Sequence, residues 1–142
     1  MRALLDINVL LALLDRDHVL HERGRRWFEQ QVGHGWASCA VTQNGFIRIV
    51  SQPGYPSPVS TRTAIGLLAT ATSADHHEYW RSEVSILDAT LFDHLRIHGP
   101  RQLTDIYLLG LAARHGGRLV TFDQTIALAA VTTADRDNLV VL

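Results

Sequence analysis

Short apolar segments that suit buried strands alternate along this chain with segments of helical periodicity, and this alternation restricts the possible folds most strongly. The strand candidates are "RALL" ending at Asp6, "GWASCAV", a short stretch near Glu78–Trp80, "RLVTF" and the terminal "LVVL". Parallel strands need long crossover connections, and helices normally supply them. The pattern therefore predicts an α/β protein whose parallel sheet is covered by helices on both faces.

The segments between the expected strands predict seven helices. Thr42 is expected as the N-cap of its helix, Thr104 as the cap of the long apolar helix before Gly116–Gly117, and a Ser/Thr residue as the cap of the "TRTAIGLLATA" helix. Residues 51–60, with three prolines and a glycine, are expected to form a loop. The expected helices span residues 8–15, 18–32, 42–50, 61–71, about 86–94, 104–115 and 124–130.

Composition narrows the class further. A chain of 142 residues with 46% hydrophobic residues predicts a single domain spanning 1–142. No apolar run reaches the length of a membrane span and the N-terminus does not fit a signal peptide, so we expect a cytoplasmic protein without membrane contact. The single cysteine, Cys39, excludes an internal disulfide and a cysteine-based zinc site, and is interpreted as a core residue. The chain contains no lysine, which excludes Schiff-base and P-loop chemistry.

Three carboxylates occupy places that the predicted fold would bring together. Asp6 follows the first strand, Asp123 follows "RLVTF", and Asp105 lies in the first turn of the long apolar helix. The carboxyl ends of strands in open α/β sheets form the ligand crevice. Grouped carboxylates repel one another unless a cation neutralises them, and oxygen ligands without cysteine favour Mg²⁺ or Mn²⁺.

Each acid also has a purely structural interpretation. Asp105 is suited to complement a helix dipole, and Asp123 is suited to cap a helix that begins near Gln124. Asp6 is harder to explain in this way, because it interrupts an apolar run without an arginine close by in sequence. Two other acidic-pocket folds are disfavoured: a haloacid dehalogenase phosphatase needs a second acid where Asn8 stands, and a receiver domain needs a late lysine.

The motifs "LLDINVLLAL", "HVLHERGRRWF", "TQNGFIRIVSQP" and "LTDIYLLGLAARHGGRLVTFD" resemble, in that order, those of PIN-domain proteins, and more narrowly of VapC-type toxin ribonucleases of bacterial toxin–antitoxin pairs. The resemblance implies a three-layer α/β/α domain with a central parallel sheet of about five strands. It implies RNA cleavage that depends on Mg²⁺ or Mn²⁺, inhibition by a VapB-type antitoxin, and a homodimer. Asp6, Asp105 and Asp123 match the family's metal-binding acids, and Asn8 and Thr121 match polar positions of a supporting shell.

One position departs from the family pattern. PIN domains often have a further acid in "TENGF", whereas this chain has "TQNGF" with Gln43 in that place. Glutamine offers a neutral carbonyl oxygen, which we expect to orient a water molecule, but it brings no charge. Either one ion suffices, or activity is reduced, or another acid such as Asp88 or Asp93 compensates; both of these also suit a solvated helix face. The alternative function is a PIN-fold binding module with weakened catalysis.

RNA binding by a chain with a net charge of −1 requires local groups of arginine. Tyr55 is suited either to stack on a base or to pack its loop, and His21 is interpreted as a packing or hydrogen-bonding residue rather than as a metal ligand paired with His18. The apolar faces of "VLLALL" and "TRTAIGLLATA" suit contacts with an antitoxin or a second subunit, or the core alone. The arginine candidates for RNA contact are Arg48, Arg81, Arg96 and Arg101.

Overall fold

The computed structural model describes all 142 residues and contains one five-stranded sheet. The strands are β1 (Ala3–Leu5), β2 (Trp36–Cys39), β3 (His77–Trp80), β4 (Arg118–Thr121) and β5 (Leu139–Val141). All four strand pairings are parallel, and the order across the sheet is β3-β2-β1-β4-β5. The predicted α/β class with a parallel sheet of about five strands is confirmed.

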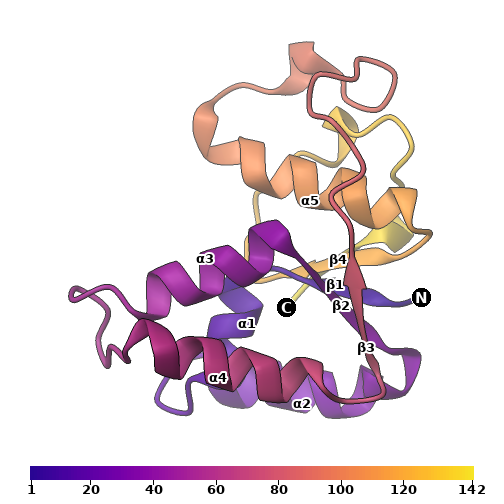
Figure 1. Ribbon diagram of the computed structural model, residues 1–142. Helices are drawn as coiled ribbons and strands as arrows, with labels where there is room; N and C mark the ends of the chain where they lie inside the picture. The colour runs from indigo at the N-terminus through magenta and orange to yellow at the C-terminus, as the bar shows by residue number, and fades with distance from the viewer.

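Helices cover both faces of the sheet (Figure 1). On one face lie α1 (Ile7–Leu14), α2 (His21–Gln31), α3 (Ala40–Val50) and α4 (Thr61–Thr72), and on the other lies α5 (Leu103–Arg114). Side chains alternate along β1, so that Ala3 and Leu5 join the core under α1–α4 while Leu4 joins the core under α5. The three-layer α/β/α arrangement therefore has two separate apolar cores. None of the helices is long and apolar enough to cross a membrane.

Two expected helices are wrong. Residues 86–94 form an irregular segment that ends in a short 3₁₀ turn at His94–Arg96, and the segment 124–130 has only a 3₁₀ turn at Leu128–Ala130. In both places aspartates bind the backbone two residues further on: Asp88 Oδ1 accepts from Thr90 N at 2.9 Å and Asp123 Oδ1 from Thr125 N at 2.7 Å. Such local hydrogen bonds compete with helix formation.

Three helix starts also differ from expectation. α3 begins at Ala40, and Thr42 lies inside its first turn, where its Oγ1 accepts a hydrogen bond from Cys39 N at 3.0 Å. α5 begins at Leu103 after a 3₁₀ turn at Pro100–Gln102, so Thr104 is not its cap. α2 begins at His21 rather than at residue 18. The expected cap of α4 is confirmed, because Ser60 Oγ accepts from Thr63 N at 3.0 Å.

The irregular segment before α5 contributes to the apolar core under α5, which is the second of the two cores. The Phe92 ring is fully buried and lies against Gly110 of α5, where an added Cβ would stand 2.5 Å from two ring atoms. Gly110 thus permits a close approach that any other residue would block. Cys39 is also fully buried and unpaired, as expected for a core cysteine.

Candidate active site at the ends of β1 and β4

The sheet order changes direction at β1, whose neighbours are β2 on one side and β4 on the other. The carboxyl ends of β1 and β4 therefore form the crevice in which ligands bind in open α/β sheets. Asp6 follows β1 directly and Thr121 ends β4, with Asp123 two residues beyond. The fold brings residues more than 100 positions apart in the chain to one edge of the sheet.

Asp6 is buried, with 4% of its surface exposed, and acts as the N-cap of α1. Its Oδ1 accepts a hydrogen bond from Ile7 N at 2.7 Å, and its Oδ2 accepts one from the Thr121 hydroxyl at 2.6 Å. Burial raises the pKa of Asp6, and the charge of Asp123 adds to this effect, although the two hydrogen bonds oppose it. Asp6 therefore has a structural role that its sequence position did not indicate, since one oxygen caps α1, and its carboxylate also interacts with the charge of Asp123.

Thr121 and Asn8 hold this site together. The Thr121 hydroxyl donates to Asp6 and accepts from Asn8 Nδ2 at 3.1 Å and from Asp123 N at 3.0 Å. Asn8 Oδ1 accepts from Phe122 N at 3.2 Å. The two residues that were expected to support the acids therefore link the start of α1 to the segment after β4.

Asp105 comes from the first turn of α5 and shares a hydrogen bond with Asp123. Burial, the charges of Asp6 and Asp123, and this hydrogen bond raise the pKa of Asp105 to about 7. Asp123 is more exposed, and its hydrogen bonds to Thr125 lower its pKa. The three acids thus act on one another electrostatically.

Asp105 and Asp123 face a polar pocket of about 270 Å³. Of the four arginines suggested for RNA contact, Arg101 lines this pocket. All four are exposed, and Arg96 is paired with Asp93 at 3.0 Å. The pocket therefore combines two acids with one basic side chain at its margin.

Gln43 lies in the first turn of α3, and its Nε2 donates to Ser38 Oγ at 3.0 Å rather than to any of the three acids. Asp88 binds Thr90 and Asp93 binds Arg96, so neither joins the acids. Neither lies on a helix face, which corrects that expectation. Sequence reasoning also missed Ser38 and His77 beside Gln43, because no motif marks either residue.

Other candidates have structural roles. The Tyr55 hydroxyl donates to Asp15 Oδ2 at 2.6 Å and ties the proline loop to the end of α1. His21 Nδ1 lies 2.7 Å from the carbonyl of Ala12, in keeping with a hydrogen-bonding role. His18 Nδ1 accepts from Leu20 N in the turn before α2, so the two histidines do not form a metal pair.

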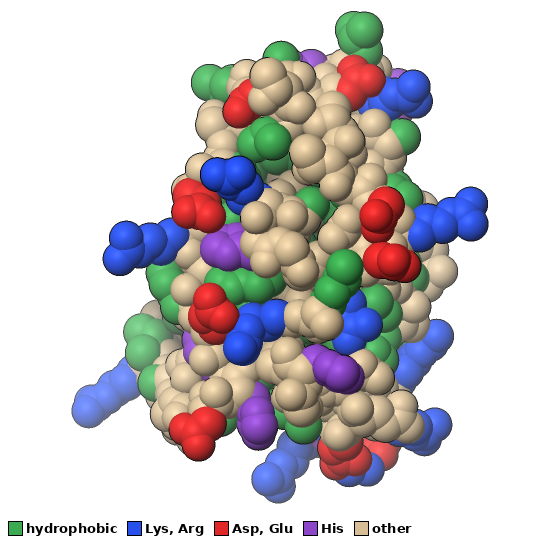
Figure 2. Space-filling model, turned by 90° about the vertical axis from the view of Figure 1, so that its right-hand side faces the viewer, with side chains coloured by type: hydrophobic (Ala, Val, Ile, Leu, Met, Phe, Trp, Pro, Cys, Tyr) green, Lys and Arg blue, Asp and Glu red, His purple; other side chains and the backbone are tan.

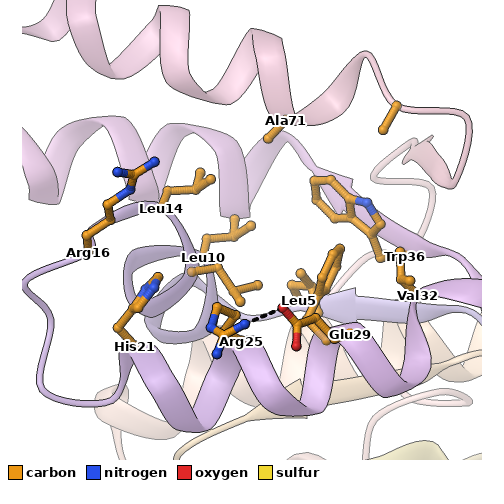
Figure 3. Close-up of a pocket in the computed structure, with 13 residues that line it drawn as sticks. Leu5, Leu10, Leu14, Arg16, His21, Arg25, Glu29, Val32, Trp36 and Ala71 are labelled. Atoms are coloured by element: carbon orange, nitrogen blue, oxygen red, sulfur yellow. Dashed lines mark hydrogen bonds and ion pairs between the residues drawn. The ribbon is translucent and has the colours of Figure 1, made fainter.

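A larger apolar pocket of about 420 Å³ lies elsewhere, between α1, α2 and α4 (Figure 3). Its floor is formed by residues such as Leu5, Leu10 and Trp36, and Arg16, His21 and the Arg25–Glu29 ion pair stand at its margin. None of the three acids lines it. Its chemistry suits an apolar segment of a partner rather than the turnover of a polar substrate.

Comparisons with known proteins agree with the fold and the site. Residues 3–132 match the PIN domain family, so the chain belongs to that family. Over its full length it is 61% identical to Ribonuclease VapC44 of Mycobacterium tuberculosis, covering all of that protein, and over 132 residues (92% of this chain, 94% of the relative) it is 42% identical to Ribonuclease VapC39. Within the family this chain is a VapC-type toxin.

Two solved structures share the fold at low sequence identity. Mycobacterium tuberculosis VapC20, a Sarcin-Ricin loop cleaving toxin, superposes with a TM-score of 0.63 at 12% identity, over 93% of this chain and 98% of that one. VapBC2 from Rickettsia felis, bound to a DNA fragment from its promoter, gives a TM-score of 0.59 at 14% identity, over 87% and 89%. These likenesses concern the fold alone.

The raised pKa of Asp105 predicts how the stability of the metal-free protein depends on pH. Because the carboxyl binds its proton more tightly in the folded state, its contribution is full below about pH 4, the ordinary carboxyl range, and is lost as the pH rises to about 7. Melting temperatures measured in EDTA between these limits should therefore fall more steeply for wild type than for Asp105→Asn. Parallel curves for the two proteins would contradict the raised pKa.

Proposed function

We propose that this chain is the toxin of a VapBC-type pair and acts in the cytoplasm as an endoribonuclease that depends on Mg²⁺ or Mn²⁺. The observation that carries the proposal is the convergence of Asp6, Asp105 and Asp123 at the β1/β4 crevice. It is supported by the full-length similarity to a protein named as a ribonuclease. Three interacting carboxylates with little compensating positive charge form a donor set for a hard cation.

The three carboxylates are suitable ligands for such an ion by their chemistry, but they are not yet arranged around a common point. No three histidine, cysteine or acidic side chains stand ready to enclose a metal. Burial and the charges of Asp6 and Asp123 raise the pKa of Asp105, so an ion bound there would compete with protonation of this carboxyl. Asp6, Asp105 and Asp123 would hold the ion, which would supply Lewis acidity at the scissile phosphate and lower the pKa of the attacking water.

The remaining side chains have defined tasks in this reaction. Thr121 and Asn8 hold Asp6 in place, and Gln43 helps to orient the attacking water through its amide oxygen. Arg101 binds a phosphate next to the acids. On the face shown in Figure 2, basic and acidic side chains are interspersed, so this face offers no broad basic surface. RNA binding therefore depends on local contacts of the Arg101 type.

Replacing Arg101 with alanine should weaken RNA binding. The plot of the logarithm of the association constant against the logarithm of the salt concentration should also become less steep, by about 1 in slope, as expected when one phosphate contact is lost. Arg62→Ala on the exposed part of α4 is the matched control. Filter binding with an Asp6→Asn background, which prevents cleavage, measures both variants. Equal salt slopes for Arg101→Ala and the control would exclude Arg101 from the phosphate contact.

The antitoxin partner is proposed to bind the apolar pocket between α1, α2 and α4. Leu13, Leu14 and Ala71 are partly exposed and line this pocket, and its floor includes the buried Leu10 of α1. An apolar segment of a VapB-type protein would cover it. A homodimer of the toxin is part of the same proposal.

The function is tested by inducing the chain in a bacterial host and mapping new 5′ ends in total RNA. Specific cleavage and growth arrest, both relieved by the co-expressed antitoxin, are expected. Growth arrest without new RNA ends would point to the second candidate, a binding module, which the absence of a fourth acid at Gln43 favours. Gln43→Glu would restore cleavage in that case.

A further inference from the structure

A chain of hydrogen bonds joins α3 to the edge strand β3 through a buried serine. Gln43 Nε2 donates to Ser38 Oγ at 3.0 Å, and Ser38 Oγ lies 2.8 Å from His77 Nε2. Ser38 is fully buried in β2, and no protein group donates to the Gln43 amide oxygen Oε1. Three elements of the fold thus meet around one hydroxyl group.

Which groups donate and which accept in these two hydrogen bonds follows from the protons that each group carries. Ser38 Oγ has two hydrogen-bonding partners, and the nitrogen of the Gln43 amide can only donate to it. The hydroxyl proton of Ser38 then has His77 Nε2 as its acceptor, so Nε2 is the unprotonated nitrogen of a neutral ring. The single hydroxyl proton of Ser38 goes to His77, so Ser38 is left to accept from Gln43.

We propose that Ser38 and His77 are positioning residues that hold the Gln43 amide with its nitrogen toward the sheet and its oxygen outward. The reversed amide would place Oε1 against a hydroxyl that has no proton left to donate. The oxygen is the atom through which glutamine can replace one function of a carboxylate. The role of this oxygen rests on the proposed nuclease function. The orientation of the amide does not depend on that function.

Packing places this amide next to the acids' end of the sheet. Gly45, two residues after Gln43, accommodates the side chain of Ile7, which follows Asp6, and an added Cβ at Gly45 would overlap that side chain. The pairing of Leu4 with Ala37 also sets Ser38 level with Leu5, one residue before Asp6. The first turn of α3 is thereby fixed beside the start of α1.

The surroundings of His77 favour its neutral form. Burial lowers the pKa of His77, and the charge of Arg2 adds to this, whereas Glu78 and the contact with Thr72 oppose it. Arg2 is itself paired with Glu78 at 2.9 Å. The Trp36 indole packs against the imidazole with ring centroids 4.4 Å apart. Donation from the Ser38 hydroxyl to His77 requires such a neutral ring with an unprotonated Nε2.

The tautomer of His77 tests the proposal without any variant. Long-range ¹H–¹⁵N correlation spectra of the metal-free protein at neutral pH should show a proton on Nδ1 and none on Nε2. A proton on Nε2 would overturn the assigned direction, because Ser38 would then be free to donate to Gln43.

Replacing Gln43 with glutamate gives a second test. A carboxylate carries no proton, so Ser38 must donate to it and must accept from His77 Nε2–H, which favours the doubly protonated ring. We expect the pKa of His77 to rise by about 1 unit or more, and to lose this rise in Ser38→Ala/Gln43→Glu. The exposed neighbour His76 is the control and should not shift. A pKa of His77 that is unchanged in Gln43→Glu, or raised equally without Ser38, would contradict the proposal.

These measurements need neither RNA nor metal. An inactive wild-type protein with the Nδ1–H tautomer would overturn the nuclease function and leave the positioning role intact. An active protein with the Nε2–H tautomer would do the reverse.

Discussion

Replacing Asp6 with asparagine is expected to abolish metal-dependent RNA cleavage, with a loss of about 100-fold or more, while the protein remains folded. Asparagine keeps the oxygen that caps α1 through Ile7 N but removes the charge that would face the ion. Because burial already raises the pKa of Asp6, losing the charge itself costs the metal-free protein little, and the lost acceptor for the Thr121 hydroxyl costs about 1 kcal/mol. Cleavage of a labelled RNA and the melting temperature in EDTA measure the two effects separately.

Asp17→Asn provides the matched control for this substitution. Asp17 is exposed just beyond α1 and lies outside the site, so it should leave both cleavage and melting unchanged. Calorimetric titration with Mn²⁺ should show heat of binding for the control and none for Asp6→Asn. Undiminished cleavage by Asp6→Asn would remove Asp6 from the metal site.

Replacing Phe92 with alanine should lower the free energy of unfolding by about 3–5 kcal/mol, a large part of the usual total of about 5–15 kcal/mol. The ring is fully buried against Gly110 and joins the irregular segment before α5 to the second core. Removing it leaves a cavity that the glycine surface cannot fill. Urea unfolding followed by circular dichroism gives the change.

Leu95 lies three residues further along the same segment and is 89% exposed, which makes it a suitable comparison. Leu95→Ala should change the unfolding free energy by no more than about 0.5 kcal/mol. Equal effects of the two substitutions would show that this segment does not contribute to the core in the way described.

The sheet and most of its covering helices could be predicted because their apolar patterns are local. The irregular segment before α5 could not, since its aspartates bind their own backbone and its one large buried ring depends on Gly110 across the chain. The same applies after β4, where Asp123 forms a turn with Thr125 instead of capping a helix. Helix periodicity carries no information about such turns.

Asp6 and Asp123 could be placed at the candidate site from the sequence because each follows a strand and the carboxyl ends of parallel strands converge. Burial raises the pKa of Asp105, whereas hydrogen bonds to Thr125 lower the pKa of the more exposed Asp123, so the two pKa values shift in opposite directions. The network around Gln43 was beyond sequence reasoning, since Ser38 and His77 meet through strand register rather than through a motif.

In the proposed mechanism, these three aspartates make the chain a metal-dependent ribonuclease. The most direct measurement is cleavage of single-stranded RNA by the purified wild-type protein, freed of antitoxin, in Mg²⁺ or Mn²⁺ and again in excess EDTA. We predict cleavage with either metal and its loss in EDTA. Cleavage that persists in EDTA, or intact RNA at saturating metal, would contradict the proposed role of these three aspartates.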